Sequence, residues 1–248
     1  LQDDGGTLDG GIATSLVQTF HILAENSNQA PSFSLGSNPT TLEDQAANIP
    51  NFATNISAGA GVIDGVLVQE VGQTVQFQIV SNSNPSLFAS GPSISSSGTL
   101  SYTPAQDASG SAVIQVRLQD NGGTANGGLN RSSIQSFTIN VAGVNDAPSF
   151  TGGGNQTIDE DAGLQTVVGW ASNISTGPQD ESDQTLFFNV SSVSGGLPFV
   201  LSPRIDPITG TLTYQVAPNA SGSAIFSVRA RDSGGTSNGG INTSTASN

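Results

Sequence analysis

The side chains that could do chemistry are carboxylates, spread along a chain of 248 residues that holds one histidine, His21. The densest acidic run is Asp159–Asp161. Two neighbouring carboxyl groups could act as acid and base on a glycosidic bond. This run lies where a strand is expected to open, however, and no aromatic sugar platform accompanies it. His21 matches the outward-facing Thr138 of a repeated segment, which indicates a solvated strand residue and not a triad member. We therefore expect no enzymatic activity.

The charge balance limits the classes of partner. Nineteen Asp and Glu residues against five arginines and no lysine give a formal net charge of −14. Nucleic acids and anionic membrane surfaces both require a basic patch, so we expect neither as a partner. No apolar run approaches the roughly 20 residues of a membrane helix, so no membrane insertion is expected in this segment. The acidity instead suits a divalent cation or simple solubility, and the absence of Cys is compatible with a bacterial surface protein.

A glycine-rich loop occurs three times and reveals the organisation of the chain. It reads DDGGTLDGG at 3–11, DNGGTANGG at 120–128 and DSGGTSNGG at 232–240. Flanking sequence repeats with the loop, which indicates tandem domains. We expect three segments: residues 1–30 as the C-terminal part of a preceding repeat, 31–147 as a complete repeat, and 148–248 as a repeat that stops before its last strand.

Each repeat has the pattern of β-structure. Ile114, Val116 and Leu118 alternate with polar residues, which is typical of a half-buried antiparallel strand. Clusters of Gly, Asn, Ser and Pro separate such segments, and no stretch has a sustained helical period. About seven short strands per repeat predict an all-β fold of tandem immunoglobulin-like Greek-key sandwiches. Because the linkers before Pro31 and Pro148 are short, we expect an elongated rod.

The glycine-rich loop itself has two interpretations. In the first it is a turn, in which Asp120 and Thr124 bind backbone amides. In the second, Asp120 and Asp232 face the preceding domain and contribute to a cation site at the joint. Turn chemistry alone is sufficient to explain the loop, so the first interpretation is favoured for the loop as a whole.

The repeat unit resembles the bacterial cadherin-like repeats of giant surface proteins and adhesins. The resemblance is carried by DEDAG at 159–163, QTLFF at 184–188, the glycine-rich loop and VNDAPSF at 144–150. In cadherin domains the corresponding linker, a D-x-D segment, an A-x-D-x-G segment and an early glutamate bind calcium. The resemblance thus implies calcium as a cofactor at the joint between 31–147 and 148–248. The ligands it implies are Glu43, Asn145, Asp146, Asp180, Asp183 and Asp232.

The joint before residue 31 departs from this pattern. Gln29 stands in place of Asp146, and Gln69 and Gly72 stand in place of Asp180 and Asp183. The spacing of the repeats also indicates an insertion of about seven residues between Ala58 and Gly72. Loss of these carboxylates predicts that calcium is absent from this first joint. The alternative at either joint is that the acids are solvated turn residues.

Two functions fit these features. The first is a structural module of a bacterial extracellular surface protein, forming a stiff stalk or filament with copies of itself or neighbouring repeats as partners. The alternative is an adhesion module that binds an extracellular polysaccharide or a partner cell surface. The segment Ala58–Gly72 is the most distinctive part of the chain, but it is aliphatic and lacks Trp and Tyr. It therefore favours packing against a neighbour over sugar binding.

The ends of the chain raise a question of assembly. Asn248 matches Ser136, so the last repeat lacks a counterpart of the strand at Phe137–Val141, whereas Phe20–Ala24 is a copy of that strand. One subunit could donate this copy to complete the last repeat of its neighbour and so build a fibre. The competing explanation, which is slightly favoured, is that the chain is an excerpt of a longer protein.

Overall fold

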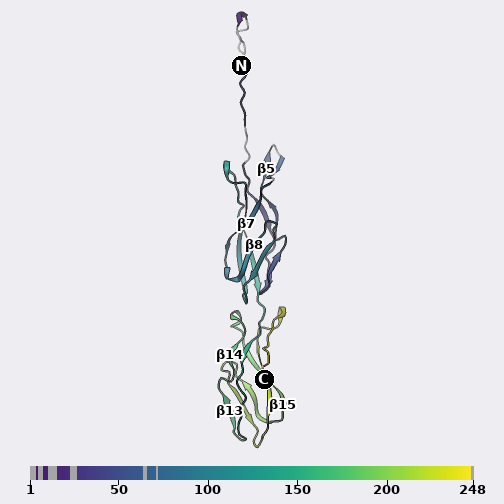
Figure 1. Cartoon of the computed structure of the whole chain (residues 1–248), viewed down its shortest axis with the longest axis vertical. Helices are drawn as coiled ribbons and strands as arrows, with labels where there is room; N and C mark the ends of the chain where they lie inside the picture. Colours follow the sequence, from purple (N-terminus) through teal and green to yellow (C-terminus); the bar gives the residue numbers. More distant parts are fainter. Residues whose placement is uncertain are drawn as a thin grey trace.

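The computed structural model describes residues 4, 8–10, 16–22, 27–63, 66–70 and 72–246. Two β-sandwiches lie end to end in a rod, and the N-terminal segment extends from the free end of the first sandwich (Figure 1). Each helical element in the described part is a three-residue 3-10 turn. Consequently, no described helix has the length and apolar character needed to span a bilayer. The expected all-β, immunoglobulin-like class is confirmed.

The first sandwich has two facing layers. One is the four-stranded sheet β2-β11-β10-β7, in which β2 runs parallel to β11 and the other pairs are antiparallel. The other combines the sheets β3-β9-β8 and β1-β4. The strands are β1 (Ser32–Leu35), β2 (Thr40–Leu42), β3 (Ala47–Ile49), β4 (Ala53–Ser57), β7 (Val75–Asn82), β8 (Phe88–Ile94), β9 (Leu100–Pro104), β10 (Gly110–Asp120) and β11 (Gln135–Ala142), with η2 (Pro85–Leu87) before β8 and η3 (Ala125–Gly127) after β10.

The core of this sandwich follows from the alternation along β10. Ile114, Val116 and Leu118 are fully buried, and Ile114 lies opposite Phe137 of β11. From the other layer, Leu100 and Tyr102 of β9 pack into the same core. Burial of one face of each sheet is the period-two pattern expected from the sequence.

The second sandwich repeats the arrangement with fewer strands. Its sheets are β12-β14, β13-β17-β16 and β15-β18. Its core is smaller and centres on Ile205, Leu212, Tyr214 and Val228. Its elements are β12 (Ser149–Thr151), β13 (Leu164–Val167), β14 (Ser172–Ser175), η4 (Gln179–Glu181), β15 (Leu186–Gly195), β16 (Phe199–Ile205), β17 (Leu212–Val216), β18 (Ala224–Asp232) and η5 (Ser237–Gly239).

The aliphatic insertion of the first repeat forms a β-hairpin. Strands β5 (Ala60–Ile63) and β6 (Val66–Gln69) pair with each other in antiparallel register. The hairpin projects from the end of the first sandwich that faces away from the second (Figure 1). The side chains of residues 61–69 lie outside the described part, so the expectation that they pack against a neighbour stays a prediction.

The described parts of the three glycine-rich loops share a three-residue turn. Each contains a short turn, η1 (Leu8–Gly10), η3 or η5. The central residue of each turn has a left-handed backbone: φ is 61° at Asp9, 54° at Asn126 and 57° at Asn238. Asn and Asp adopt this conformation more readily than other non-glycine residues. In these three-residue turns, the sequence repeat is therefore also a structural repeat.

Candidate functional site

The joint between the sandwiches gathers carboxylates around the linker that connects β11 to β12. Glu43 lies in the turn between β2 and β3 and is only 4% exposed. Its Oε1 accepts a hydrogen bond of 2.5 Å from the Val144 amide of the linker. The first sandwich therefore holds one side of the linker with a buried carboxylate.

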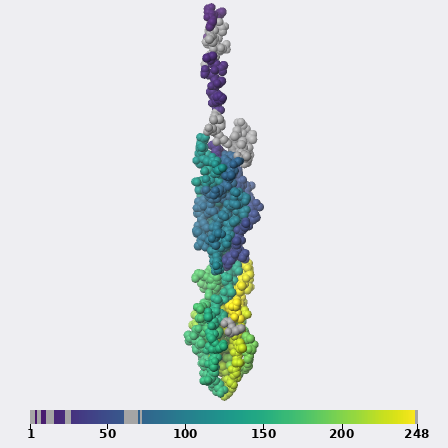
Figure 2. Space-filling view, in the orientation of Figure 1, coloured from purple at the N-terminus to yellow at the C-terminus, as the bar shows by residue number. Residues whose placement is uncertain are grey.

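The second sandwich holds the other side in the same way. Glu181, at the end of η4, accepts a 2.8 Å hydrogen bond at Oε1 from the Asp146 amide. In addition, the Ser109 hydroxyl of the first sandwich donates to Oδ2 of Asp180 across the joint, at 3.2 Å. The surfaces of the two sandwiches meet here (Figure 2). The linker is thus held by a hydrogen bond to one glutamate of each sandwich.

Burial and mutual repulsion raise the pKa values of these groups. Burial is the largest cause for Glu43, Asp146 and Glu181, and each pKa is raised further by neighbouring carboxylates. The neighbours include Asp44 and Asp180, and no basic side chain is among the causes. Carboxylates drawn together without a positive charge repel one another, which favours their protonated forms.

Several carboxylate oxygens in the joint have no hydrogen-bond partner. Glu43 Oε2, Glu181 Oε2 and Asp232 Oδ2 are all buried and unpaired. Leaving a buried acceptor unsatisfied is costly, and the cost is greater for a charged group. Within the described residues, nevertheless, no three acidic or histidine side chains form a group that could hold a metal ion as they stand. The joint offers unused ligands but not an assembled coordination shell.

The structure gathers only some of the six expected ligands. Asp146 and Asp180 lie close enough to Glu43 to repel its charge, and Asp232 lies close enough to Glu181 to do the same. Asn145 is also at the joint, but its side chain is engaged with the glycine-rich loop through Asp232. Asp183, by contrast, is exposed, and no contact places it with the others.

Sequence reasoning missed three carboxylates of this cluster. Glu181 is the buried residue of η4, whereas the expectation had assigned its neighbours Asp180 and Asp183. Asp44 and Asp107 also act on Asp146. The Asp44 side chain accepts the Asp107 amide at 3.3 Å, which places these two residues side by side. The recurrence of Glu70 at the position of Glu181 was a signal that could have found the latter.

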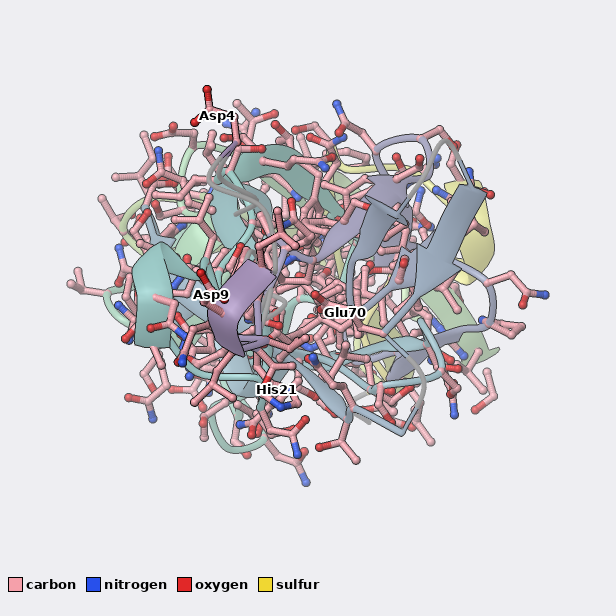
Figure 3. The ribbon with its side chains drawn as sticks, turned by 90° about the horizontal axis from the view of Figure 1, so that it is seen from above. Asp4, Asp9, His21 and Glu70 are labelled. Atoms are coloured by element: carbon pink, nitrogen blue, oxygen red, sulfur yellow. The ribbon has the colours of Figure 1, made fainter. Side chains whose placement is uncertain are left out.

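The first joint has a glutamate, Glu70, at the position of Glu181, but its carboxylate oxygens have different hydrogen-bond donors. Glu70 Oε1 accepts the Gln29 amide at 2.7 Å, and Oε2 accepts the Gln73 side chain at 3.0 Å. Glu70 lies near the middle of the outline when the rod is viewed along its length (Figure 3). Both oxygens of Glu70 have donors, whereas Glu181 has one oxygen without a donor.

The glycine-rich loop has turn hydrogen bonds of the kind that the first interpretation predicts. Asp120 Oδ1 accepts the Gly122 amide at 2.8 Å, as expected of a turn, and Asp232 does the same with Gly234 at 2.9 Å. Thr124 makes no side-chain capping bond. Asp120 and Asp232 also face the linker, where each accepts a hydrogen bond from an asparagine.

Comparison with known proteins gives little further information. No protein-family model matches the sequence, and no curated protein matches it. Among solved structures, the chain is similar to the crystal structure of EC1-2 of human mucin-like protocadherin. That match has a TM-score of 0.39 and 16% sequence identity, and it covers 87% of this chain and 95% of that chain. The sandwich fold is established by the strand order and the two cores of this chain itself.

Proposed function

We propose that this chain is a structural repeat module of a bacterial extracellular surface protein, in which calcium stiffens the joint between the two sandwiches. The main support for this proposal is a set of buried carboxylate oxygens at that joint that have no hydrogen-bond donor: Glu43 Oε2, Glu181 Oε2 and Asp232 Oδ2. They come from both sandwiches, so a cation bound by them would connect the two bodies. Tandem cadherin-like repeats working by length and stiffness fit this arrangement.

The donor set has the chemistry that calcium prefers. Calcium takes six to eight oxygen ligands from carboxylates, carbonyls and waters in flexible geometries. Glu43, Asp146, Asp180, Glu181 and Asp232 would hold it. Of the other two expected ligands, Asn145 has both polar side-chain atoms engaged in hydrogen bonds, and Asp183 is exposed. Because the carboxylates do not already form a group that could hold a metal, binding requires their side chains to turn inward.

Calorimetry of the full chain in EDTA and in millimolar calcium tests this proposal. Calcium at about 100 times its dissociation constant would stabilise the fold by roughly 2.7 kcal/mol, which raises the melting temperature by several degrees. Asp146→Asn and Glu181→Gln should remove most of the increase. Glu160→Gln should keep it, because Glu160 matches Glu43 in sequence but is exposed at the far end of the second repeat. Equal melting temperatures for the wild type in EDTA and calcium would exclude the site.

A second proposal, strand complementation between copies, is favoured by the edge of β18. Within the described residues, β18 pairs with β15 on one side, whereas β10 pairs with both β7 and β11. The segment Phe20–Ala24 copies Phe137–Val141 of β11, and its Phe20 and Ile22 are 82% and 83% exposed. In the register of β10 and β11, Phe20 of a second copy would lie opposite Phe226. Ala24, the end of the expected donor strand, lies outside the described residues.

Sedimentation velocity tests this second proposal. Donor-strand exchange predicts oligomers that grow with protein concentration, and Phe20→Asp should abolish them because a charge would enter the core of the neighbour. A wild-type chain that sediments as a monomer at all concentrations would exclude exchange between copies of this chain.

A further inference from the structure

Asn145 fills the glycine-rich loop that follows β18. Its Nδ2 donates to Asp232 Oδ1 at 3.0 Å, to the Gly235 carbonyl at 3.2 Å and to the Ile241 carbonyl at 2.8 Å. Its Oδ1 accepts a 2.7 Å hydrogen bond from the side chain of Gln184. The main chain joins the contact as well, because the Ile241 amide donates to the Asn145 carbonyl at 2.7 Å.

The same contact occurs in the first repeat. Asn28 Nδ2 donates to Asp120 Oδ1 at 2.8 Å, to the Gly123 carbonyl at 3.1 Å and to the Leu129 carbonyl at 2.9 Å. Asn28 Oδ1 accepts from Gln73 Nε2 at 2.9 Å, and the Leu129 amide donates to the Asn28 carbonyl at 2.8 Å. Equivalent atoms therefore make equivalent hydrogen bonds at both linkers.

This contact explains two of the four glycines in each loop, Gly122 and Gly128 in one repeat and Gly234 and Gly240 in the other. A Cβ at Gly122 or Gly234 would overlap the side-chain amide of Asn28 or Asn145. A Cβ at Gly128 or Gly240 would lie 3.0 Å from the asparagine Cβ. None of these four glycines has a positive φ. They are needed for the close approach of another side chain and not for an unusual backbone conformation.

We propose that the glycine-rich loop of each repeat is a binding site for the asparagine of the linker that precedes it, and that this contact fixes the linker on its repeat without a cation. The site selects an amide. Three acceptors surround Nδ2 and one donor faces Oδ1, so an aspartate would place its carboxylate against Asp232 and two carbonyls. The proposal does not rest on calcium, because the contact recurs at the first joint, where Gln29 replaces Asp146.

Hydrogen exchange of the full chain in EDTA tests the proposal, with the Ile241 and Leu129 amides as reporters. In the wild type we expect both amides to be protected in the absence of calcium. Asn145→Ala should accelerate exchange at Ile241 by about tenfold or more and leave Leu129 unchanged. Asn145→Asp should accelerate it further, because of charge repulsion. The control is Asn155→Ala, which removes an exposed asparagine of the same repeat.

The equivalent Asn28 contact in the first repeat provides a second test of the proposal. Should Asn145→Ala unfold the second repeat, Asn28→Ala provides the same measurement at Leu129 on the larger core of the first repeat. Rapid exchange of both reporters in the wild type, or equal exchange in wild type and the asparagine variants, would overturn the proposal. Because all measurements are made in EDTA, neither result depends on whether calcium binds.

Discussion

Glu43 places a buried negative charge among other carboxylates. Its Oε1 accepts the Val144 amide, its Oε2 has no donor, and Asp180, Asp44 and Asp146 repel it. Glu43→Gln removes the charge and can keep the acceptor for Val144. In EDTA we expect this variant to be more stable than the wild type by about 1 kcal/mol, which corresponds to a melting temperature roughly 2–4 °C higher. Thermal unfolding followed by circular dichroism measures the difference.

The matched control for this substitution is Glu160→Gln. Glu160 occupies the equivalent sequence position in the second repeat but is exposed. Removing its charge should change the melting temperature little, because exposed substitutions are usually within about 0.5 kcal/mol of neutral. A Glu43→Gln variant no more stable in EDTA than the wild type would contradict the repulsion at the joint.

The same carboxylates set the pH dependence of stability. The pKa values of Glu43, Asp146 and Glu181 are raised in the folded chain, chiefly by burial. The folded state therefore binds more protons than the unfolded state, and its stability falls as pH rises through the raised values. In EDTA we expect the melting temperature to rise on acidification from pH 7 towards about pH 5, above the ordinary carboxyl range.

Calcium should reverse this dependence, because protons compete with the cation for the same oxygens. With saturating calcium, acidification over the same interval should lower the melting temperature. Scanning calorimetry across this pH range, with and without EDTA, measures both slopes. A melting temperature that falls on acidification in EDTA would show that these groups do not dominate the titration.

At the scale of secondary-structure elements, two glycines of the second repeat provide a matched test of packing. Gly210 lies before β17 with φ of 65°, and Gly163 lies before β13 with φ of 74°. A Cβ at Gly210 would overlap the Ala171 carbonyl, whereas nothing lies within 4 Å of a Cβ at Gly163. Gly163→Ala should therefore cost only the backbone strain of about 1 kcal/mol, and Gly210→Ala should cost at least about 2 kcal/mol more. Urea unfolding of the two variants measures the difference, and equal costs would contradict the close packing of Gly210 on Ala171.

The strands were predictable because a period of two in a sequence directly indicates which side chains face the core. The alternation of Ile114, Val116 and Leu118 predicted β10 and its buried face correctly. The arrangement of the carboxylates at the joint was harder to predict from the sequence. Whether Asp180, Glu181 or Asp183 turns inward depends on the 3-10 turn η4, and no periodic pattern specifies a single turn. Asn145 was expected as a metal ligand because its linker resembles that of cadherin domains, but the sequence does not reveal that the loop around it presents mainly acceptors to Nδ2.

At the scale of the whole molecule, two kinds of contact act on one joint. The linker is held to the second sandwich by the Asn145 contact, and its amides donate to a carboxylate of each sandwich. The first contact uses only neutral amide donors, so removing a cation would leave it intact. The second gathers negative charge, so without a cation it opposes close approach of the sandwiches. The angle between the sandwiches should therefore respond to both.

Small-angle X-ray scattering measures this response through the largest dimension of the rod. With calcium, the wild type should be fully extended with a narrow distribution of lengths. In EDTA it should become moderately flexible, because the Asn145 contact still fixes the linker on the second sandwich. Asn145→Ala in EDTA loses both constraints and should show the shortest mean dimension and the broadest distribution. Asn28→Ala serves as the control, because Asn28 lies before the first sandwich and does not touch this joint. If Asn145→Ala and the wild type scatter identically in EDTA, the asparagine contact does not restrain the joint.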